Sequence, residues 1–255
     1  MGSMAHDVTA GTSGQPRRRL LARPLSKLWI VMLVVGVAAV ITGVTLIVGP
    51  LIGVFSRGSA DQSALQAWRN GGSAALVGPA HGGSSDVGKS STCGSSSSSD
   101  YALVTFTGLP QYGYAGVAGD GTWDLLNQRS MVHYHGTPNP GQQGNVIIAF
   151  HREPDYEHID QLGVGETITI EDKACHTFVY RITNVWDLPP SQVTQLVPTS
   201  GYDLTMITCN PWWQDYERLV WRASLISPAP GSSGAGQFTT SGTSGQAANP
   251  GQPSF

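Results

Sequence analysis

Cys209 and the histidines are the residues of this 255-residue chain that are best suited to covalent chemistry. Cys209 follows residues 203–208 (DLTMIT), a run typical of a strand, and precedes Asn210-Pro211, where the chain must turn. A thiol at a strand end beside a loop is placed for access rather than for core packing. Because the thiolate is the nucleophile and a free thiol is mostly protonated at neutral pH, Cys209 needs a base or a cation nearby.

His151 is a candidate for that partner because it closes residues 145–150 (NVIIAF), another strand-like run. It should therefore stand at the mouth of a sheet, as Cys209 does. The other histidines of this region precede a turn, lie on an expected helix or lie in an expected hairpin: His133, His135, His158 and His176. The local pattern alone leaves the choice among them open.

The other two cysteines raise the question of disulfide or free thiol. Cys93 lies in a Gly/Ser-rich segment and is expected to be an incidental exposed residue. Cys175 lies at a turn between two expected strands, where a structural role is expected. A disulfide between Cys175 and Cys209 remains an alternative, and it would make the domain a catalytically inactive surface-binding module.

The apolar run from Leu28 to Phe55 is long enough to cross a bilayer, which takes about 20 apolar residues. A signal peptide has a shorter apolar region of about 7–15 residues. Positive charges are sparse after the run but cluster before it. The cluster consists of Arg17, Arg18, Arg19, Arg23 and Lys27. This asymmetry predicts a single-pass cell-membrane anchor with a cytoplasmic N-terminus and an extracellular domain after Phe55.

Composition divides the chain into five parts. Residues 1–27 form a basic cytoplasmic tail, 28–55 the anchor, 56–99 a Gly/Ser-rich tether, 100–226 the folded domain and 227–255 a Gly/Ser/Pro-rich disordered tail. The tether and the tail cannot bury enough apolar surface to offset the entropy lost on ordering. Charged residues make up only 12% of the chain, against about 25% in typical globular proteins, so the folded part is shorter than the chain.

Short β-branched and aromatic runs separated by turn residues predict a mostly β domain. The clearest runs are residues 101–107, 145–150, 166–171, 177–186, 203–208 and 218–225. Two short helices are expected at residues 122–128 and 155–162. Many short strands at this spacing suggest a sandwich or a closed barrel, and a barrel is favoured because closure removes exposed strand edges.

Four ordered elements of the domain resemble the sortase family. Residues 205–209 (TMITC) are similar to its Thr-Leu-x-Thr-Cys signature, and Arg218 stands nine residues later, where the family has an arginine. Upstream, residues 133–137 (HYHGT) resemble a His-Tyr-Pro-Gly-Thr element, and residues 144–152 (GNVIIAFHR) resemble Gly-Asn-x-x-x-Ala-Gly-His-Arg. The resemblance spans residues 101–226, and four elements in order are far more specific than any one of them.

The resemblance implies an eight-stranded sortase-type β-barrel with short helices, preceded by one transmembrane helix. It implies a cysteine transpeptidase that cleaves a Leu-Pro-x-Thr-Gly-like sorting signal between Thr and Gly through a thioester. Cys209 would be the nucleophile, His151 the acid that protonates the leaving glycine amine, and Arg218 the group that stabilises the oxyanion. The implied partners are surface proteins bearing the sorting signal and an amine of the cell wall or of a pilin, without a metal or an organic cofactor.

Substrate contacts are expected from Thr208, which could form a hydrogen bond in the groove, from Phe150 and from His133 in the upstream element. Phe150 replaces the small residue that the family usually has before its histidine, so we expect it to narrow or reshape the groove. His135 replaces the proline of the upstream element. Neither change removes a catalytic group.

Two other kinds of function fit less well. A net charge of −3 offers no basic excess for a phosphate backbone, so nucleic-acid binding is not expected. A cell-wall cysteine peptidase or amidase is the related alternative, but most such enzymes place Cys before His in the chain, and here His151 precedes Cys209.

Overall fold

A computed structural model describes residues 27–74, 93–94, 97, 99–231, 251 and 253 of the chain. The predicted cytoplasmic tail before Lys27, most of the C-terminal tail and residues 75–92 of the predicted tether lie outside the described residues. The chain divides into two compact units, residues 1–48 and 49–255, and the second contains all the residues that are discussed as functional below.

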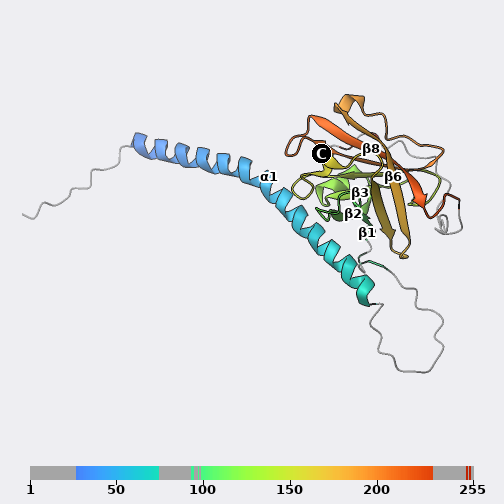
Figure 1. Cartoon of the computed structure of the whole chain (residues 1–255). Helices are drawn as coiled ribbons and strands as arrows, with labels where there is room; N and C mark the ends of the chain where they lie inside the picture. Colours follow the sequence, from blue (N-terminus) through green and yellow to red (C-terminus); the bar gives the residue numbers. More distant parts are fainter. Residues whose placement is uncertain are drawn as a thin grey trace, which may run out of the picture. The chain divides into compact units, whose positions relative to one another are not determined.

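Helix α1 spans Lys27–Ala74 and contains the apolar run (Figure 1). It is the one described helix that is long and apolar enough to cross a membrane, with a mean hydropathy of 2.8 over its most apolar window. Residues 56–74, expected to belong to the flexible tether, are helical instead. Composition did not predict this helix, because its Gly, Ser and Ala residues have no strong pattern. Contacts with the barrel stabilise it instead.

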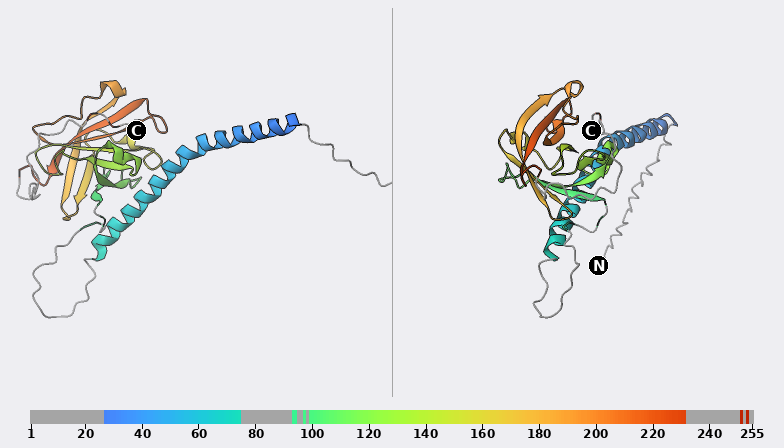
Figure 2. Two further views of the ribbon diagram at one scale, coloured as in Figure 1. Left: turned by 180° about the vertical axis from the view of Figure 1, so that it is seen from behind. Right: turned by 90° about the vertical axis from the view of Figure 1, so that its right-hand side faces the viewer.

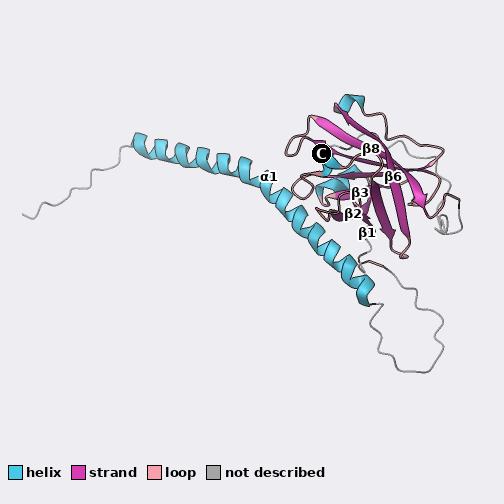
Figure 3. Ribbon diagram, in the orientation of Figure 1, coloured by secondary structure: helices cyan, strands magenta, loops and turns pink. Residues whose placement is uncertain are grey.

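Eight strands form one closed barrel in the order β1-β2-β3-β4-β7-β8-β6-β5 (Figures 1 and 3). Their bounds are β1 Asp100–Thr105, β2 Ala115–Gly121, β3 Met131–Tyr134, β4 Gly144–Phe150, β5 Thr167–Asp172, β6 Thr177–Leu188, β7 Tyr202–Asn210 and β8 Glu217–Ser227. The pairs β2–β3 and β4–β7 are parallel and the other neighbours are antiparallel. The prediction of an eight-stranded barrel with an apolar helix before it is confirmed.

The strands expected from the sequence correspond to β1 and to β4 through β8, with ends that differ by a few residues. β2 and β3 were not expected as strands. β2 reads AGVAGDG, whose small residues give little β signal, and β3 is only four residues long. The two expected helices are shorter 3₁₀ turns, η1 at Trp123–Asn127 and η2 at Ile159–Gln161, and η3 at Pro190–Gln192 adds a third.

β4 shows how the sheet separates two clusters of buried side chains. Because successive side chains of a strand point to opposite faces, Val146, Ile148 and Phe150 lie in the main cluster with Trp221. Ile147 and Ala149 lie on the other face, in a smaller cluster with Ile207, Val220 and Leu126. β4 is therefore buried on both faces, which explains its continuous apolar sequence. Figure 2 shows the barrel strands from two further sides.

Cys93 and Cys175 form a disulfide, and Cys209 is a free thiol. The expectation that Cys93 is incidental is therefore wrong, and so is the alternative pairing of Cys175 with Cys209. The backbone N–H of Cys93 also donates to the carbonyl of Lys173 at 2.9 Å, beside the turn between β5 and β6. A Gly/Ser-rich composition indicates little intrinsic structure, but it does not exclude a covalent tie.

Candidate active site

Strand register brings His151, Cys209 and Arg218 to one place. β4 and β7 run parallel with Ala149 beside Ile207, so the same register continued by two residues places His151 level with Cys209. β7 and β8 are antiparallel, and Cys209 is paired directly with Arg218. All three residues share the face of the smaller cluster, because each is two residues from a member of it.

Cys209 ends β7 as a buried free thiol with 4% of its surface exposed. Burial raises its pKa to about 12, the positive charge of Arg218 opposes this rise, and the negative charges of Glu153 and Asp215 add to it. The thiol is therefore protonated at neutral pH in this arrangement. A stronger positive field or a proton acceptor is needed to form the thiolate.

His151 follows β4 and is 8% exposed. Its Nε2 lies 2.9 Å from the carbonyl oxygen of Leu126 and 3.2 Å from Nη1 of Arg57. Burial lowers the pKa of His151 to about 4, the positive charge of Arg57 lowers it further, and the hydrogen bond to Leu126 opposes the shift. The imidazole is therefore neutral at pH 7 in this structure.

Arg218 is the second residue of β8, and 7% of its surface is exposed. Its Nη1 donates to the carbonyl oxygens of Asp215 at 2.5 Å and of Glu217 at 2.9 Å, which fix the guanidinium at the turn before the strand. Arg222 lies on the same face, but it pairs with Thr205 in the register and its Nη2 donates to the carbonyl of Gln195 at 2.7 Å. The arginine that faces Cys209 across the sheet is therefore Arg218.

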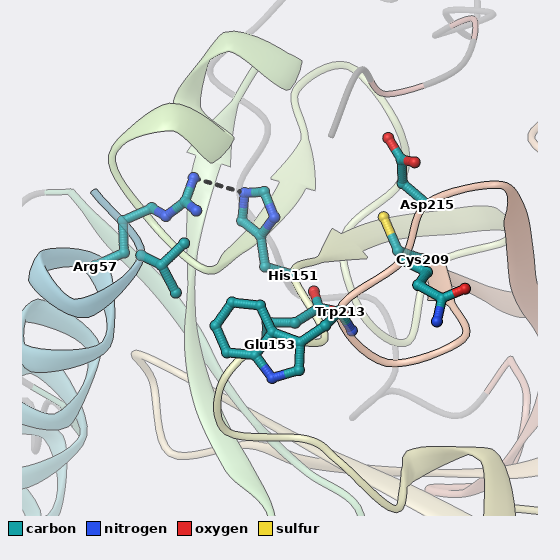
Figure 4. A pocket seen from close by; sticks show the side chains of 8 residues that line it. Arg57, His151, Glu153, Cys209, Trp213 and Asp215 are labelled. Atoms are coloured by element: carbon teal, nitrogen blue, oxygen red, sulfur yellow. Dashed lines mark hydrogen bonds between the residues drawn. The ribbon is translucent and has the colours of Figure 1, made fainter. Parts of the chain in front are cut away.

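A pocket of about 250 Å³ opens between His151 and Cys209 (Figure 4). Its described lining is completed by Val54 and Arg57 of α1, by Glu153, and by three residues of the β7–β8 loop: Trp213, Gln214 and Asp215. In Figure 4 the imidazole of His151 lies between Arg57 and the thiol of Cys209. A nucleophile and an acid/base group thus line one cavity. Arg218 is not among the described lining residues, but it is paired with Cys209 in the register, and the three groups together suit acyl transfer.

A family model described as "Sortase domain" matches residues 109–226. The match runs from the loop after β1 into β8 and includes His151, Cys209 and Arg218. The barrel is a sortase domain. A comparison with curated proteins finds no match.

Solved structures similar to the sortase domain are themselves sortases. A Clostridium perfringens sortase D5 transpeptidase is 28% identical over 50% of this chain and 79% of that chain, with a TM-score of 0.44. Streptococcus agalactiae sortase C1 is 23% identical over 50% and 70%, with a TM-score of 0.44. Corynebacterium diphtheriae sortase A is 20% identical over 52% and 63%, with a TM-score of 0.43. Membership of the family supports a transpeptidase and leaves the sortase class open.

Phe150 and Thr208 do not reach the pocket, because each is one residue away from a catalytic candidate and so faces the other side of its strand. Phe150 is fully buried in the main cluster, 5.3 Å from Tyr156 between ring centroids. It therefore cannot narrow the groove, and that expectation is corrected. Thr208 is also fully buried, and its Oγ1 donates to the carbonyl of Phe150 at 2.6 Å.

His133 is 2% exposed and lies in a separate cluster of hydrogen-bonded side chains. Its Nδ1 lies 2.8 Å from Asp120, its Nε2 lies 3.0 Å from the hydroxyl of Thr137, and its ring stacks on Tyr101 at 4.2 Å. These contacts fix the turn after β3. His133 is not among the described residues that line the pocket, so its surroundings support a structural role rather than a substrate contact.

The α1 residues at the pocket were missed from the sequence. The buried and half-buried positions of this part of α1 recur every three or four residues, which is typical of one helical face. They are residues 54, 57, 58, 61, 64, 65 and 68. Several of these positions carry small or polar residues, so a search for apolar residues at helical spacing does not detect the face. Among the described residues, no group of three or more His, Cys, Asp or Glu side chains could hold a metal ion.

Proposed function

We propose that the chain is a membrane-anchored cysteine transpeptidase that cleaves a Leu-Pro-x-Thr-Gly-like sorting signal between Thr and Gly. The acyl group is then transferred to an amine of the cell wall or of a pilin. The observation that carries the proposal is the register of three neighbouring strands, which puts Cys209 between the His151 strand and Arg218. The pocket between His151 and Cys209 provides space for the scissile bond.

The reaction uses the three residues in two half-steps. The thiol of Cys209 first gives its proton to His151, which forms a thiolate and an imidazolium. The thiolate attacks the threonine carbonyl, and the negative oxygen of the tetrahedral intermediate is stabilised by Arg218. As the C–N bond breaks, protonated His151 gives its proton to the glycine amine, which leaves a thioester. In the second half-step the acceptor amine attacks the thioester, His151 takes the amine proton, and the thiolate is released as the new amide forms.

The decisive experiment is mass spectrometry of the full chain after incubation with a library of Leu-x-x-Thr-Gly peptides. The expected result is an adduct on Cys209 with the mass of the peptide acyl group lacking its glycine. Addition of an amine should remove the adduct and yield the amide product. Absence of an acyl adduct across the library, with Cys209 reduced and accessible to an alkylating reagent, would contradict the proposal.

Anchoring and orientation are tested separately. α1 supplies an apolar helix of sufficient length, and the basic residues before Leu28 favour a cytoplasmic N-terminus. A reporter enzyme that is active only outside the membrane, fused after Phe255, should be active in the intact cell. Cytoplasmic activity of a complementary reporter at the same site would overturn the orientation.

A further inference from the structure

The second half of α1 presents one face that is shielded from solvent. Gly58, Leu65 and Trp68 are buried, and the positions between them on the same face are half-buried. The half-buried positions are Val54, Arg57, Asp61 and Ala64. Residues at spacings of three and four lie on one side of a helix, so this stripe is a docking face.

Two contacts fix the far end of this face on the barrel. Trp68 is 2% exposed, and its indole Nε1 donates to a carboxylate oxygen of Glu171 on β5 at 2.7 Å. Trp68 and Leu65 form a separate buried cluster with Val117 of β2. One turn closer to the pocket, a carboxylate oxygen of Asp61 accepts the backbone N–H of Ser130 at 3.1 Å.

The near end of the face reaches the active site. Gly58 is buried beside residues 154 and 155, where a Cβ would make ordinary van der Waals contacts at 3.6 Å with Asp155 and 3.7 Å with Pro154. One residue earlier, Nη1 of Arg57 lies 3.2 Å from Nε2 of His151 and 3.4 Å from the carbonyl of Leu126. Val54, one turn further, lines the pocket.

These contacts hold Nε2 of His151 and place a positive charge beside the imidazole, while the other ring nitrogen lies on the side of Cys209 (Figure 4). Nε2 faces a carbonyl oxygen, so it carries the proton there, and the guanidinium beside it also offers only N–H groups. A second positive charge on the imidazole is disfavoured at that distance from Arg57. The other titratable groups in the described pocket lining are the carboxyl groups of Glu153 and Asp215 and the thiol of Cys209. In a neutral ring that is protonated at Nε2, the nitrogen on the side of Cys209 carries no proton, so the ring cannot protonate a leaving amine there.

We propose that residues 54–68 of α1 are an autoinhibitory segment, which when docked holds Arg57 against His151 and keeps the active site in a resting state. Transpeptidation then requires this segment to move away from the pocket. The proposal rests on the proposed role of His151 as the acid. The residue that makes the inhibitory contact, Arg57, lies outside residues 109–226, which the sortase family model matches.

The Cys93–Cys175 disulfide holds the segment in its docked position. Gly94, next to Cys93, lies so close to Trp68 that a Cβ on it would be 2.7 Å from the indole ring. The disulfide ties this stretch to the turn between β5 and β6. Gly94 therefore packs against the indole, and loss of the disulfide beside it should weaken docking of the segment.

The first test is single-turnover acylation of the full chain in detergent by a Leu-Pro-x-Thr-Gly peptide. Arg57→Ala should acylate about tenfold faster or more than wild type, because removal of the adjacent positive charge makes the imidazolium of His151 easier to form. Arg69→Ala is the matched control, because Arg69 is an exposed arginine of the same helix, and its rate should equal that of wild type. An Arg57→Ala rate equal to or below wild type would overturn the proposal.

A second set of variants releases the segment without altering its contact residue at His151. Trp68→Ala and the double variant Cys93→Ser/Cys175→Ser should also acylate faster than wild type, and hydrogen exchange of residues 54–68 should rise in both. If either variant keeps the native circular dichroism and shows faster exchange but slower acylation, the segment supports catalysis and the proposal is wrong. These variants also decide the matter if Arg57→Ala does not fold.

Failure of the proposed function is distinguishable from failure of this inference. If no variant and no wild-type sample forms a thioester, the transpeptidase proposal is at fault, and the inhibitory contact is judged by NMR titration of His151. Arg57→Ala should then raise the pKa of His151, because the repelling charge is gone, whereas Arg69→Ala should leave it unchanged. An unchanged titration in Arg57→Ala would overturn the inference on its own.

Discussion

The strand ends of the sortase domain and the docked half of α1 meet at the same pocket, but they do so by different means. His151, Cys209 and Arg218 are positioned by the register of neighbouring strands. Arg57 and Trp68 are positioned by side-chain contacts between segments that are distant in sequence. Register is determined by the strand sequences and is hard to shift, whereas a docked helix can be released as a unit. The first region suits chemistry, and the second suits control of it.

The sharpest way to test the catalytic side of this comparison is Cys209→Ala. We expect it to abolish acylation, because no other described residue of the pocket lining is a thiol. The fold should persist, since removal of one sulfur atom at a strand end leaves a small cavity. Peptide cleavage and circular dichroism would be measured together, and residual turnover with the wild-type product would refute Cys209 as nucleophile.

The next largest effect is expected at Arg218, with Arg222 as its control. Both arginines lie on one face of β8, but Arg218 is paired with Cys209 and Arg222 with Thr205, about 13 Å further along at roughly 3.3 Å per residue. Loss of one oxyanion donor lowers the rate by a factor of about 10² to 10³. Arg218→Ala and Arg218→Lys should both show this loss in single-turnover acylation, because lysine lacks the planar fork of the guanidinium.

Arg222→Ala should stay within about tenfold of the wild-type rate, because its contacts are to Gln195 and Asp203. Its loss should appear instead as a modest decrease in stability. The reverse ranking of the two arginines in acylation would show that the register does not determine which of them acts on the oxyanion.

The difference between the two regions also explains how much could be predicted from the sequence. The catalytic candidates stand in short motifs, and the strands that carry them have clear β patterns, so fold and triad could be predicted together. Phe150 and Thr208 were assigned to the groove from proximity in sequence, although alternation along a strand places them on the opposite face from His151 and Cys209. Alternation along β4 and β7 is sufficient to predict that Phe150 and Thr208 face away from the side of His151 and Cys209.

The contact of Arg57 and the partner of Cys93 could not be predicted in the same way. Both depend on which distant segment lies opposite, and the Cys93–Cys175 disulfide joins residues separated by 82 positions. Trp68 stood within a stretch whose Gly, Ser and Ala content indicated a flexible tether. A single buried indole and a covalent tie outweigh that composition.

The docked region is tested through stability with the double variant Cys93→Ser/Cys175→Ser. A disulfide that closes a loop of this length typically stabilises a protein by about 2–4 kcal/mol, mainly by constraining the unfolded chain. We expect a loss of that size in the free energy of unfolding, measured with denaturant on the full chain in detergent. Cys209→Ala is the control, because it removes a thiol without breaking a bond between chain segments. Equal stability of the two variants would show that the disulfide does not hold this region.

The smallest expected effect concerns Thr208, for which a groove role and a structural role predict different results. Its hydroxyl donates to the carbonyl of Phe150 and so joins the ends of β7 and β4, next to Cys209 and His151. Thr208→Val keeps the shape and removes the donor, and we expect it to lower the free energy of unfolding by about 1–2 kcal/mol.

Thr205→Val is the matched control for that change, because Thr205 is an equally buried threonine of β7 whose hydroxyl donates to the side chain of Asn145 on β4 at 2.7 Å. If Thr208 is structural, the two variants should lose similar stability, and both should keep kcat/KM for the sorting-signal peptide within about threefold of wild type, a change below 1 kcal/mol. A fall in kcat/KM confined to Thr208→Val would restore Thr208 to the substrate groove. It would also mean that strand parity alone does not separate the catalytic face from the core at the end of β7.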